Sequence, residues 1–416
     1  MASVHLLTLV HGMWGNPSHL SELRRIISET YPLSVDGMQL QVLIAETNQD
    51  DSTYDGIDWG AERVTQEIID KVEGLRASGK EVKRLSITGY SLGGLIGRYV
   101  VGILYQKGFF ERVEPVNFNT FATPHLGLPR YPSILSRVFY HLGPKLLSRT
   151  GEQFYCVDRW SPKGRPLLDI MADPEQAFYK GLASFKQIRI YANVVHDLTV
   201  PYLTSAIELV DPFIDYEKSG MAVEFNPKYE PIIDSYDYPP SPPVEPPVLS
   251  KQWILQLKPR RPMLPPILQR QFPLNLLIYI CIPFLIPVFI VAVVVNLSLA
   301  SRSSRARLRL LEKDESRAER LVHVLAKLED KLGDDAASLL IKTSDAPPSD
   351  KPRAALTLLQ RNIAQSLNNL PIKKELVFIN GVVNSHAPIV CRDVNRFPVN
   401  RRGEGVIRHW ATAFIL

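Results

Sequence analysis

The stretch that decides the fold is Gly89-Tyr90-Ser91-Leu92-Gly93-Gly94. It follows the strand-forming run Leu85-Ser86-Ile87-Thr88 and precedes a helix-forming stretch that begins at Leu95. A strand, the pattern Gly-x-Ser-x-Gly and a helix, in that order, make a sharp turn that presents a nucleophilic serine. The glycines are needed because a side chain before or after the serine would clash with the backbone nearby. We therefore predict Ser91 as a nucleophile at the amino end of a helix, where partial positive charge favours a developing anion.

Outward from this motif, short apolar runs alternate with amphipathic stretches up to about Tyr202, a pattern typical of parallel α/β folds. A helix is expected from about Trp59 to Gly74, because its apolar residues recur at helical spacing. The predicted fold is an α/β-hydrolase with a mostly parallel central sheet flanked by helices. The predicted strands are Leu6 to Val10, Gln41 to Ile44, Arg84 to Thr88, Pro115 to Phe121, Gln187 to Val195 and a last one around Leu376 to Ile379.

A second motif, His11-Gly12-Met13-Trp14, follows the first predicted strand. Acyl transfer needs two backbone amides aimed at the oxyanion, one from the residue after the nucleophile and one from a loop after an early strand. Leu92 and Met13 are the residues at these places. His11, Trp14 and Tyr90 are candidate substrate contacts. The alternative is an ordinary glycine turn with His11 hydrogen-bonded in the core.

The catalytic acid should follow the serine at the end of a later strand, since the chain order in this fold is serine, acid, histidine. Asp197 satisfies this order, because it ends the run Tyr191 to His196 and precedes the rigid Thr-Val-Pro turn. Three other acids compete with it, but none ends so clear a strand. They are Asp158, Asp169 and Asp173.

The catalytic base should be one of the histidines that follow the acid. His323 lies in a charged, helix-forming stretch, and His409 lies in a stretch that resembles a helix packing on the core. His386 comes shortly after the last predicted strand, in a loop that can reach the serine. The predicted mechanism has His386 accept the proton of Ser91 while Asp197 holds the imidazole in the correct tautomer.

The composition is that of a folded chain that acts without nucleic acid. The net charge of +5 is mild for 416 residues, and 45% of the residues are hydrophobic. Three cysteines cannot form a disulfide framework, which indicates a reducing, cytosol-facing compartment. The apolar run near Met1 is too short for a signal peptide and lacks a basic region before it. Neither a metal-ligand cluster nor a phosphate-binding glycine loop is evident, so no cofactor is expected.

The composition along the chain predicts an insertion that divides the hydrolase domain. Residues 1–230 hold its first part with the nucleophile, oxyanion hole and acid, and residues 353–416 its second part with the histidine. Residues 231–272 form a proline-rich basic linker, because runs such as Pro239-Pro240 and Pro246-Pro247 cannot continue a helix. Residues 273–300 form a hydrophobic membrane- or droplet-associating segment, and residues 301–352 a charged helix and flexible linker.

The hydrophobic segment carries no charge from Leu276 to Val295, long enough for a helix of about 20 residues to span a bilayer. A single crossing would separate His386 from Ser91, so the segment should instead form a hairpin or lie in the interface. Pro283 and Pro287 should kink or break a continuous helix. Both flanks are basic, which keeps both ends cytosolic and attracts anionic headgroups. A buried core helix is the alternative.

The motifs together resemble the putative serine esterase family of lipase-like α/β-hydrolases, and within it the fungal lipid droplet phospholipases. The resemblance rests on His11 to Gly15, Gly89 to Tyr99, Phe121 to Gly127, Ser148 to Gly151, Asn193 to Tyr202 and His386 to Arg392. It covers about Val4 to Tyr202 and about Leu376 to Trp410. It implies hydrolysis of glycerophospholipid acyl esters, whereas the spacing alone indicates an esterase. Many lipases carry histidine where this chain has Tyr90.

The expected function is that of a phospholipase at a lipid droplet or a cytosol-facing membrane, with the endoplasmic reticulum as an alternative membrane. A neutral-lipid lipase acting on acylglycerols or sterol esters is the alternative enzyme. A catalytically silent membrane-tethering protein is a third possibility, which the complete set of competent residues disfavours. A lid over the site is expected around Pro129 to Tyr155, with an ordinary packed helix as its alternative.

Overall fold

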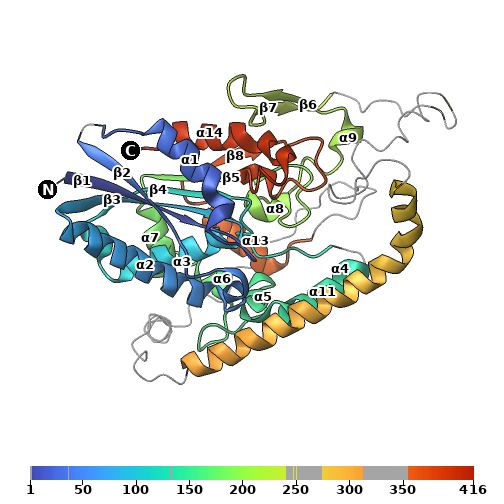
Figure 1. Cartoon of the computed structure of the whole chain (residues 1–416), viewed down its shortest axis with the longest axis horizontal. Coiled ribbons are helices and arrows are strands. Elements are labelled where there is room, and N and C mark those ends of the chain that lie inside the picture. The colour runs from blue at the N-terminus through green and yellow to red at the C-terminus, as the bar shows by residue number, and fades with distance from the viewer. Residues whose placement is uncertain are drawn as a thin grey trace.

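The computed structural model describes residues 2–239 apart from 36, 132 and 133, then 247, 250, 274–312 and 355–416. It has a six-stranded sheet with the order β2-β1-β3-β4-β5-β8 (Figure 1). Every neighbouring pair in this sheet is parallel. The strands are β1 (Ala2–Val10), β2 (Met38–Ile44), β3 (Lys80–Tyr90), β4 (Glu114–Phe121), β5 (Gln187–Asn193) and β8 (Ile372–Val377). The predicted parallel α/β sheet is confirmed.

Helices cover both faces of the sheet, because the side chains of each strand alternate between two apolar layers. On β1, Leu7 and Leu9 face the layer formed with α1 (Ser21–Thr30) and α14 (Glu404–Thr412). Val4, Leu6 and Val10 face the other, larger layer. The helices of that layer are α2 (Ile57–Ala77), α3 (Leu92–Gln106), α7 (Ala177–Ala183) and α13 (Leu358–Leu367), and Figure 1 shows the two groups on opposite sides of the sheet.

Shorter elements lie in the loops, and all but the turn Phe109–Glu111 follow the carboxyl end of a strand, where sites form in such sheets. The α-helices are α4 (Ile134–Leu146), α5 (Ser148–Phe154), α6 (Leu167–Ile170), α8 (Tyr202–Ser205) and α9 (Tyr216–Ser219). The 3₁₀ turns are η1 (Pro17–Leu20), η2 (Asp50–Tyr54), η3 (Phe109–Glu111), η6 (Pro388–Val390) and η7 (Pro398–Gly403). Helices α4 and α5 occupy the stretch where a lid was expected.

An antiparallel hairpin of β6 (Ala222–Phe225) and β7 (Ile233–Asp237) precedes the insertion. Residues 233–237 of the predicted linker are therefore a strand. The predicted linker beyond residue 239, apart from residues 247 and 250, lies outside the described residues, as do the charged stretch beyond residue 312 and His323.

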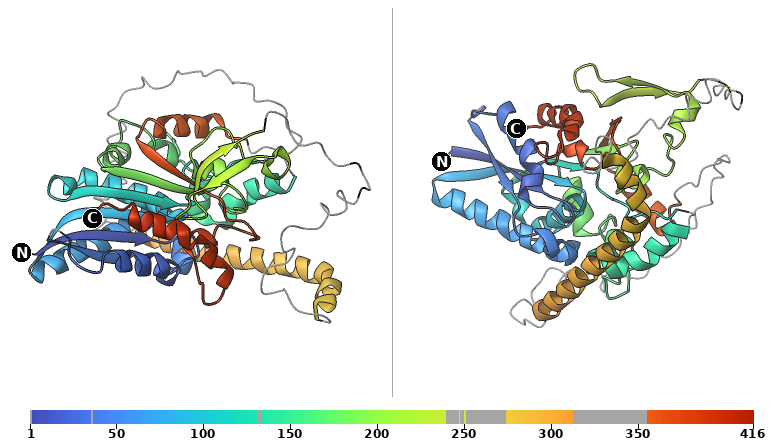
Figure 2. Two further views of the ribbon diagram at one scale, coloured as in Figure 1. Left: turned by 90° about the horizontal axis from the view of Figure 1, so that it is seen from above. Right: turned by 45° about the vertical axis from the view of Figure 1, so that its right-hand side comes forward.

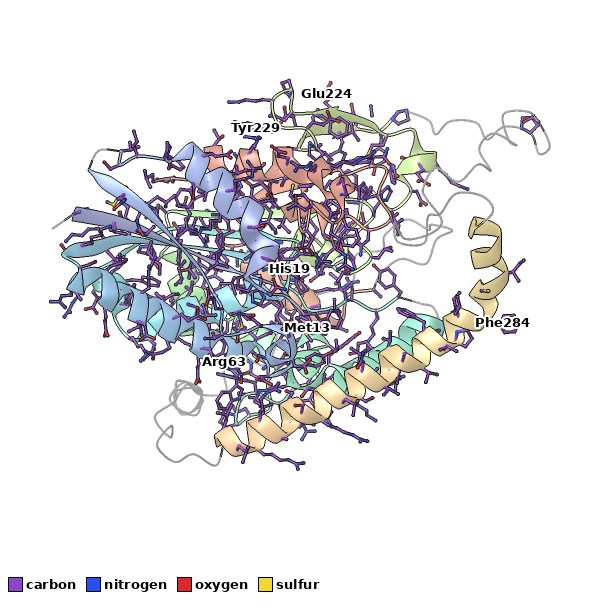
Figure 3. The ribbon with its side chains drawn as sticks, in the orientation of Figure 1. Met13, His19, Arg63, Glu224, Tyr229 and Phe284 are labelled. Atoms are coloured by element: carbon purple, nitrogen blue, oxygen red, sulfur yellow. The ribbon has the colours of Figure 1, made fainter. Side chains whose placement is uncertain are left out.

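The hydrophobic segment lies in one helix, α11 (Leu274–Glu312), that does not fold back on itself. The hairpin alternative is therefore wrong for this segment, which contains no glycine or other turn-forming pair. The helix bends where Figure 3 labels Phe284, as the prolines predicted. Pro287 has no N–H to donate to the carbonyl one turn earlier, so one hydrogen bond is lost and the helix kinks without ending.

Candidate active site

Ser91 occupies the turn between β3 and α3 with φ 55° and ψ −125°, a left-handed backbone that is strained for serine. Its amide donates to the carbonyl of Phe121 on β4 at 2.9 Å, which holds the turn against the sheet. A Cβ on Gly89 would lie 2.4 Å from Cα of Gly94, and one on Gly93 only 2.1 Å from the carbonyl oxygen of Val10. The two glycines are therefore required by sterics, as the motif predicted.

His386 reaches Ser91 from a loop between β8 and η6. Its Nε2 lies 3.1 Å from Oγ of Ser91, and both residues expose less than a tenth of their surface. Its backbone amide donates to the side-chain oxygen of Asn384 at 3.1 Å. The structure therefore brings together two residues that are 295 positions apart in the chain.

Asp197, after the end of β5, completes the chain of contacts. Its Oδ2 lies 3.0 Å from Nδ1 of His386, and its Oδ1 accepts the amides of Thr199 and Val200 at 2.9 and 2.8 Å. Burial alone would raise the pKa of Asp197, but the facing imidazole and these hydrogen bonds together hold it below its ordinary value of 3.8. The carboxylate is thus ionised and can orient the imidazole.

The competing acids have other partners. Asp158 accepts the amide of Leu167 at 2.9 Å. Asp169 and Asp173 both pair with Arg165, at 2.8 and 2.9 Å. Among the later histidines that the structure describes, His409 lies on α14, with Nδ1 3.0 Å from the hydroxyl of Tyr191. Of all the candidates that the described residues include, Asp197 and His386 are the pair that reaches Ser91.

The loop after β1 passes directly against the serine. A Cβ on Gly12 would lie 2.7 Å from Cβ and 3.3 Å from Oγ of Ser91. Met13, the next residue, is therefore at the position expected for an oxyanion donor, and Figure 3 shows it near the carboxyl ends of the strands. Leu92 opens α3, where the first amides of a helix lack intrahelical acceptors. Met13 and Leu92 thus remain the predicted oxyanion donors.

The three candidate substrate contacts differ in exposure. Trp14 is 51% exposed, has φ 53° and donates its indole N–H to the hydroxyl of Tyr54 at 2.7 Å, so its ring is available at the surface. His11 is buried, with Nδ1 3.1 Å from the Gly12 carbonyl oxygen. Tyr90 is also buried and donates its hydroxyl to the His386 carbonyl at 2.9 Å. Neither His11 nor Tyr90 presents its side chain to the surface, and their assignment as substrate contacts stays a prediction.

Sequence reasoning missed the residues that join the loops of the acid and the base. Asn193, the last residue of β5, donates to Oδ2 of Asp197 at 2.9 Å and to the carbonyl of Ser385 at 3.3 Å. Ser385 in turn donates its hydroxyl to the carbonyl of Val195 at 2.8 Å. An amide side chain four residues before the acid was the available signal, but its partner near residue 385 depends on the tertiary fold.

The amino-terminal half of the chain matches a known protein family. Residues 1–207 match the family described as "Putative serine esterase (DUF676)". The chain belongs to this serine esterase family. The match contains Ser91 and Asp197, and His386 lies beyond it.

Two curated fungal relatives are named as putative lipases. The "Putative lipase C4A8.10" of Schizosaccharomyces pombe is 30% identical over 210 residues, which are 49% of this chain and 26% of that protein. The "Putative lipase ROG1" of Saccharomyces cerevisiae is 26% identical over 238 residues, 56% of this chain and 33% of that protein. The chain thus matches about a third or less of the length of these relatives. A solved "putative cell surface hydrolase from Lactobacillus plantarum WCFS1" is 14% identical, with a TM-score of 0.27 over 49% of this chain and 74% of that one.

Proposed function

We propose that this protein is a serine-dependent lipid ester hydrolase that releases fatty acids from glycerophospholipids at a lipid surface. The observation that carries the proposal is the position of the His386 imidazole, within 3.1 Å of the Ser91 hydroxyl and 3.0 Å of the Asp197 carboxylate. A serine that contacts a base, which in turn contacts a buried carboxylate, is the arrangement that activates a hydroxyl for attack on an ester.

The mechanism follows from the contacts. His386 accepts the proton of Ser91 as Oγ attacks the ester carbonyl, and Asp197 stabilises the imidazolium that forms. The amides of Met13 and Leu92 stabilise the oxyanion. His386 then donates its proton to the alcohol that leaves. A water molecule, activated by the same imidazole, hydrolyses the acyl-serine and releases the fatty acid.

A lipid surface as the place of action is supported by α11. The helix from Phe284 to Leu311 contains an 18-residue stretch with a mean hydropathy of 2.4, of which 6% is buried, so by length and composition alone it could cross a membrane. Figure 2 shows its amino-terminal part extending past the rest of the molecule. Phe284, Val288 and Phe289 are 75, 67 and 68% exposed. Large apolar side chains on every side of a helix require hydrocarbon around it.

A position in one leaflet fits better than a full crossing. Residues on both sides of α11 in the chain meet in one site, so both ends of the insertion lie on one side of the surface. The straight part of α11 between the bend at Phe284 and the buried Ala300 is about 24 Å long at 1.5 Å per residue. That is shorter than the hydrocarbon core of about 30 Å.

The arginines in the carboxyl-terminal part of α11 favour a phospholipid surface on the cytosolic side, at a droplet or a membrane. Arg302, Arg305 and Arg309 are exposed directly after the apolar part, where they would meet anionic headgroups. Cys156, Cys281 and Cys391 are all free thiols, which fits a reducing compartment.

The test is fatty-acid release from phosphatidylcholine vesicles and from a triacylglycerol emulsion, by wild type and by Ser91→Ala. Release from phospholipid that is lost in Ser91→Ala supports the proposal. Release from triacylglycerol alone would replace phospholipid by neutral lipid as the substrate. Activity that survives Ser91→Ala, or no release from any ester, would overturn the proposed mechanism.

A further inference from the structure

The residue directly before the nucleophile is in contact with the base. Tyr90 donates its hydroxyl to the backbone carbonyl of His386 at 2.9 Å. Its ring centroid lies 5.1 Å from that of the His386 imidazole, with the ring planes inclined by 36°. One side chain therefore contacts both the backbone and the ring of the residue that must accept the proton.

Tyr90 itself is firmly placed. It is the last residue of β3, pairs in register with Phe121 of β4 and is only 2% exposed. Burial raises the pKa of Tyr90 well above its ordinary value, so its phenol stays protonated at neutral pH and can donate. The contact thus joins the central sheet to the loop of the base.

The loop of His386 needs such support because it is not part of a helix or strand. His386 lies between β8 and η6, and its amide is held by Asn384, a residue of the same loop. Its carbonyl is held by Tyr90, which belongs to the sheet and is the chain neighbour of Ser91. The nucleophile and the support of the base are consequently adjacent residues of one strand end, so they move together.

We infer that Tyr90 is a positioning residue: it sets the distance between His386 and Ser91 through its hydroxyl bond to the His386 carbonyl. The inference rests on the proposed roles of Ser91 and His386. Histidine at this position, as in many lipases, could not make the same contact, because its ring nitrogens lie closer to the backbone than a phenolic oxygen does. The tyrosine is thus a specific solution to holding this histidine loop.

The experiment measures the rate at which a fluorophosphonate labels Ser91 in the full-length protein, since this reaction needs the base but no lipid surface. Tyr90→Phe keeps the ring and removes the donor. We expect labelling to be about 10- to 100-fold slower, the range that a small misplacement of reacting groups produces. With a soluble short-chain ester, kcat should fall by the same factor while KM stays unchanged, because the contact is to the base and not to the substrate.

The matched control is Tyr191→Phe. Tyr191 is also buried, and its hydroxyl lies 3.0 Å from Nδ1 of His409, away from the serine. This variant loses a comparable hydrogen bond and should label at the wild-type rate. Replacement of Tyr90 by para-aminophenylalanine restores a donor at the same place and should recover most of the rate.

The outcomes separate the inference from the function on which it rests. Wild-type protein that does not label at Ser91 would refute the proposed hydrolase. Labelling of Tyr90→Phe at the wild-type rate would refute the positioning role and leave the hydrolase intact. Equal slowing in Tyr191→Phe, or no recovery with para-aminophenylalanine, would also refute the positioning role, because the loss would then be a general effect of altering a buried tyrosine.

Discussion

At the scale of the single residue, hydrogen bonds occupy both carboxylate oxygens of Asp197, the candidate acid. Asp197 directs Oδ2 to His386 and Asn193, and Oδ1 to the backbone amides of Thr199 and Val200. Each of these partners donates to a carboxylate. An amide at this position would direct an N–H group toward one of them and repel it. The surroundings of Asp197 therefore favour its ionised form, as its lowered pKa also indicates.

Asp197→Asn should consequently impair catalysis far more than folding. The variant favours the wrong tautomer of His386, with Nε2 protonated and unable to accept the proton of Ser91. We expect kcat on a soluble ester to fall by about 10⁴. Circular dichroism of the variant should match that of wild type. A loss of less than tenfold in kcat would mean that His386 does not depend on this carboxylate for its tautomer.

Among single residues, some parts of the candidate site can be predicted from the sequence and others cannot. A local pattern predicts Ser91 as the nucleophile, and the order of residues in the chain predicts Asp197 and His386 as its partners. The role of Tyr90 depends on a carbonyl 296 residues away, and that of Asn193 on a loop 192 residues away. Such pairings come from the arrangement of β3, β5 and β8 in the sheet, which spacing along the chain does not reveal.

Among the elements, the short helix α6 is held at its amino end by a carboxylate that is costly to ionise. Asp158 accepts the amide of Leu167, the first residue of α6, and is 9% exposed. Burial, with a smaller contribution from the nearby Asp58, raises the pKa of Asp158 to about 6, against an ordinary value of 3.8. An acid whose pKa is raised on folding destabilises the fold above that pKa. This cost fades as the pH falls through about 6 and is absent below 3.8.

Asp158→Asn should therefore change stability in a pH-dependent way. The asparagine oxygen can still accept the Leu167 amide, but it carries no charge to bury. The stability that the variant gains over wild type should be about 2 kcal/mol larger at pH 8 than at pH 4. Guanidinium unfolding at the two pH values measures this difference. The same change in stability at both pH values would mean that Asp158 is not protonated on folding.

A second element, α11, is attached to the hydrolase domain by a buried carboxylate. Asp55, 1% exposed, accepts hydrogen bonds from Ser304 at 2.7 Å and Arg307 at 2.8 Å, and pairs with Arg63 of α2. Ser301 adds a bond to the carbonyl of Lys145, the penultimate residue of α4. The sequence predicted the apolar helix but not this attachment, because Asp55 and Ser304 are 249 residues apart.

Asp55→Ala should release this end of α11. The change leaves Arg63 and Arg307 facing each other without the carboxylate, so hydrogen exchange of the amides of residues 300–311 should become at least about tenfold faster. The amides of the central sheet should exchange as in wild type. Arg309→Gln, at an exposed position of the same helix, serves as the control and should leave exchange unchanged. Equal exchange in Asp55→Ala and wild type would show that the contact contributes no stability.

On the scale of the whole molecule, the site and the exposed helix share one side. The candidate site lies at the carboxyl ends of the parallel strands, and Figures 1 and 3 show α11 passing along that side. Exposed apolar residues of the loops there, such as Trp14 and Leu198, accompany it. Since the far end of α11 is attached through Asp55, insertion of its apolar part would hold the site close to the lipid surface. A substrate could then enter from that surface without crossing water.

This arrangement predicts that surface binding and chemistry can be separated. Phe289→Glu places a charge on the exposed apolar part of α11, where burial in hydrocarbon should cost about 2.5–3.5 kcal/mol. We expect binding to phosphatidylcholine–phosphatidylserine vesicles, measured by flotation, to weaken by at least about 50-fold. Phospholipid hydrolysis should fall with it, while turnover of a soluble short-chain ester stays the same. Leu33→Glu is the matched control, because Leu33 is 77% exposed but lies before β2, at the opposite end of the sheet. If Phe289→Glu binds vesicles like wild type, or if Leu33→Glu weakens binding equally, α11 is not the lipid-binding element, because the charge on the helix would then have no specific effect.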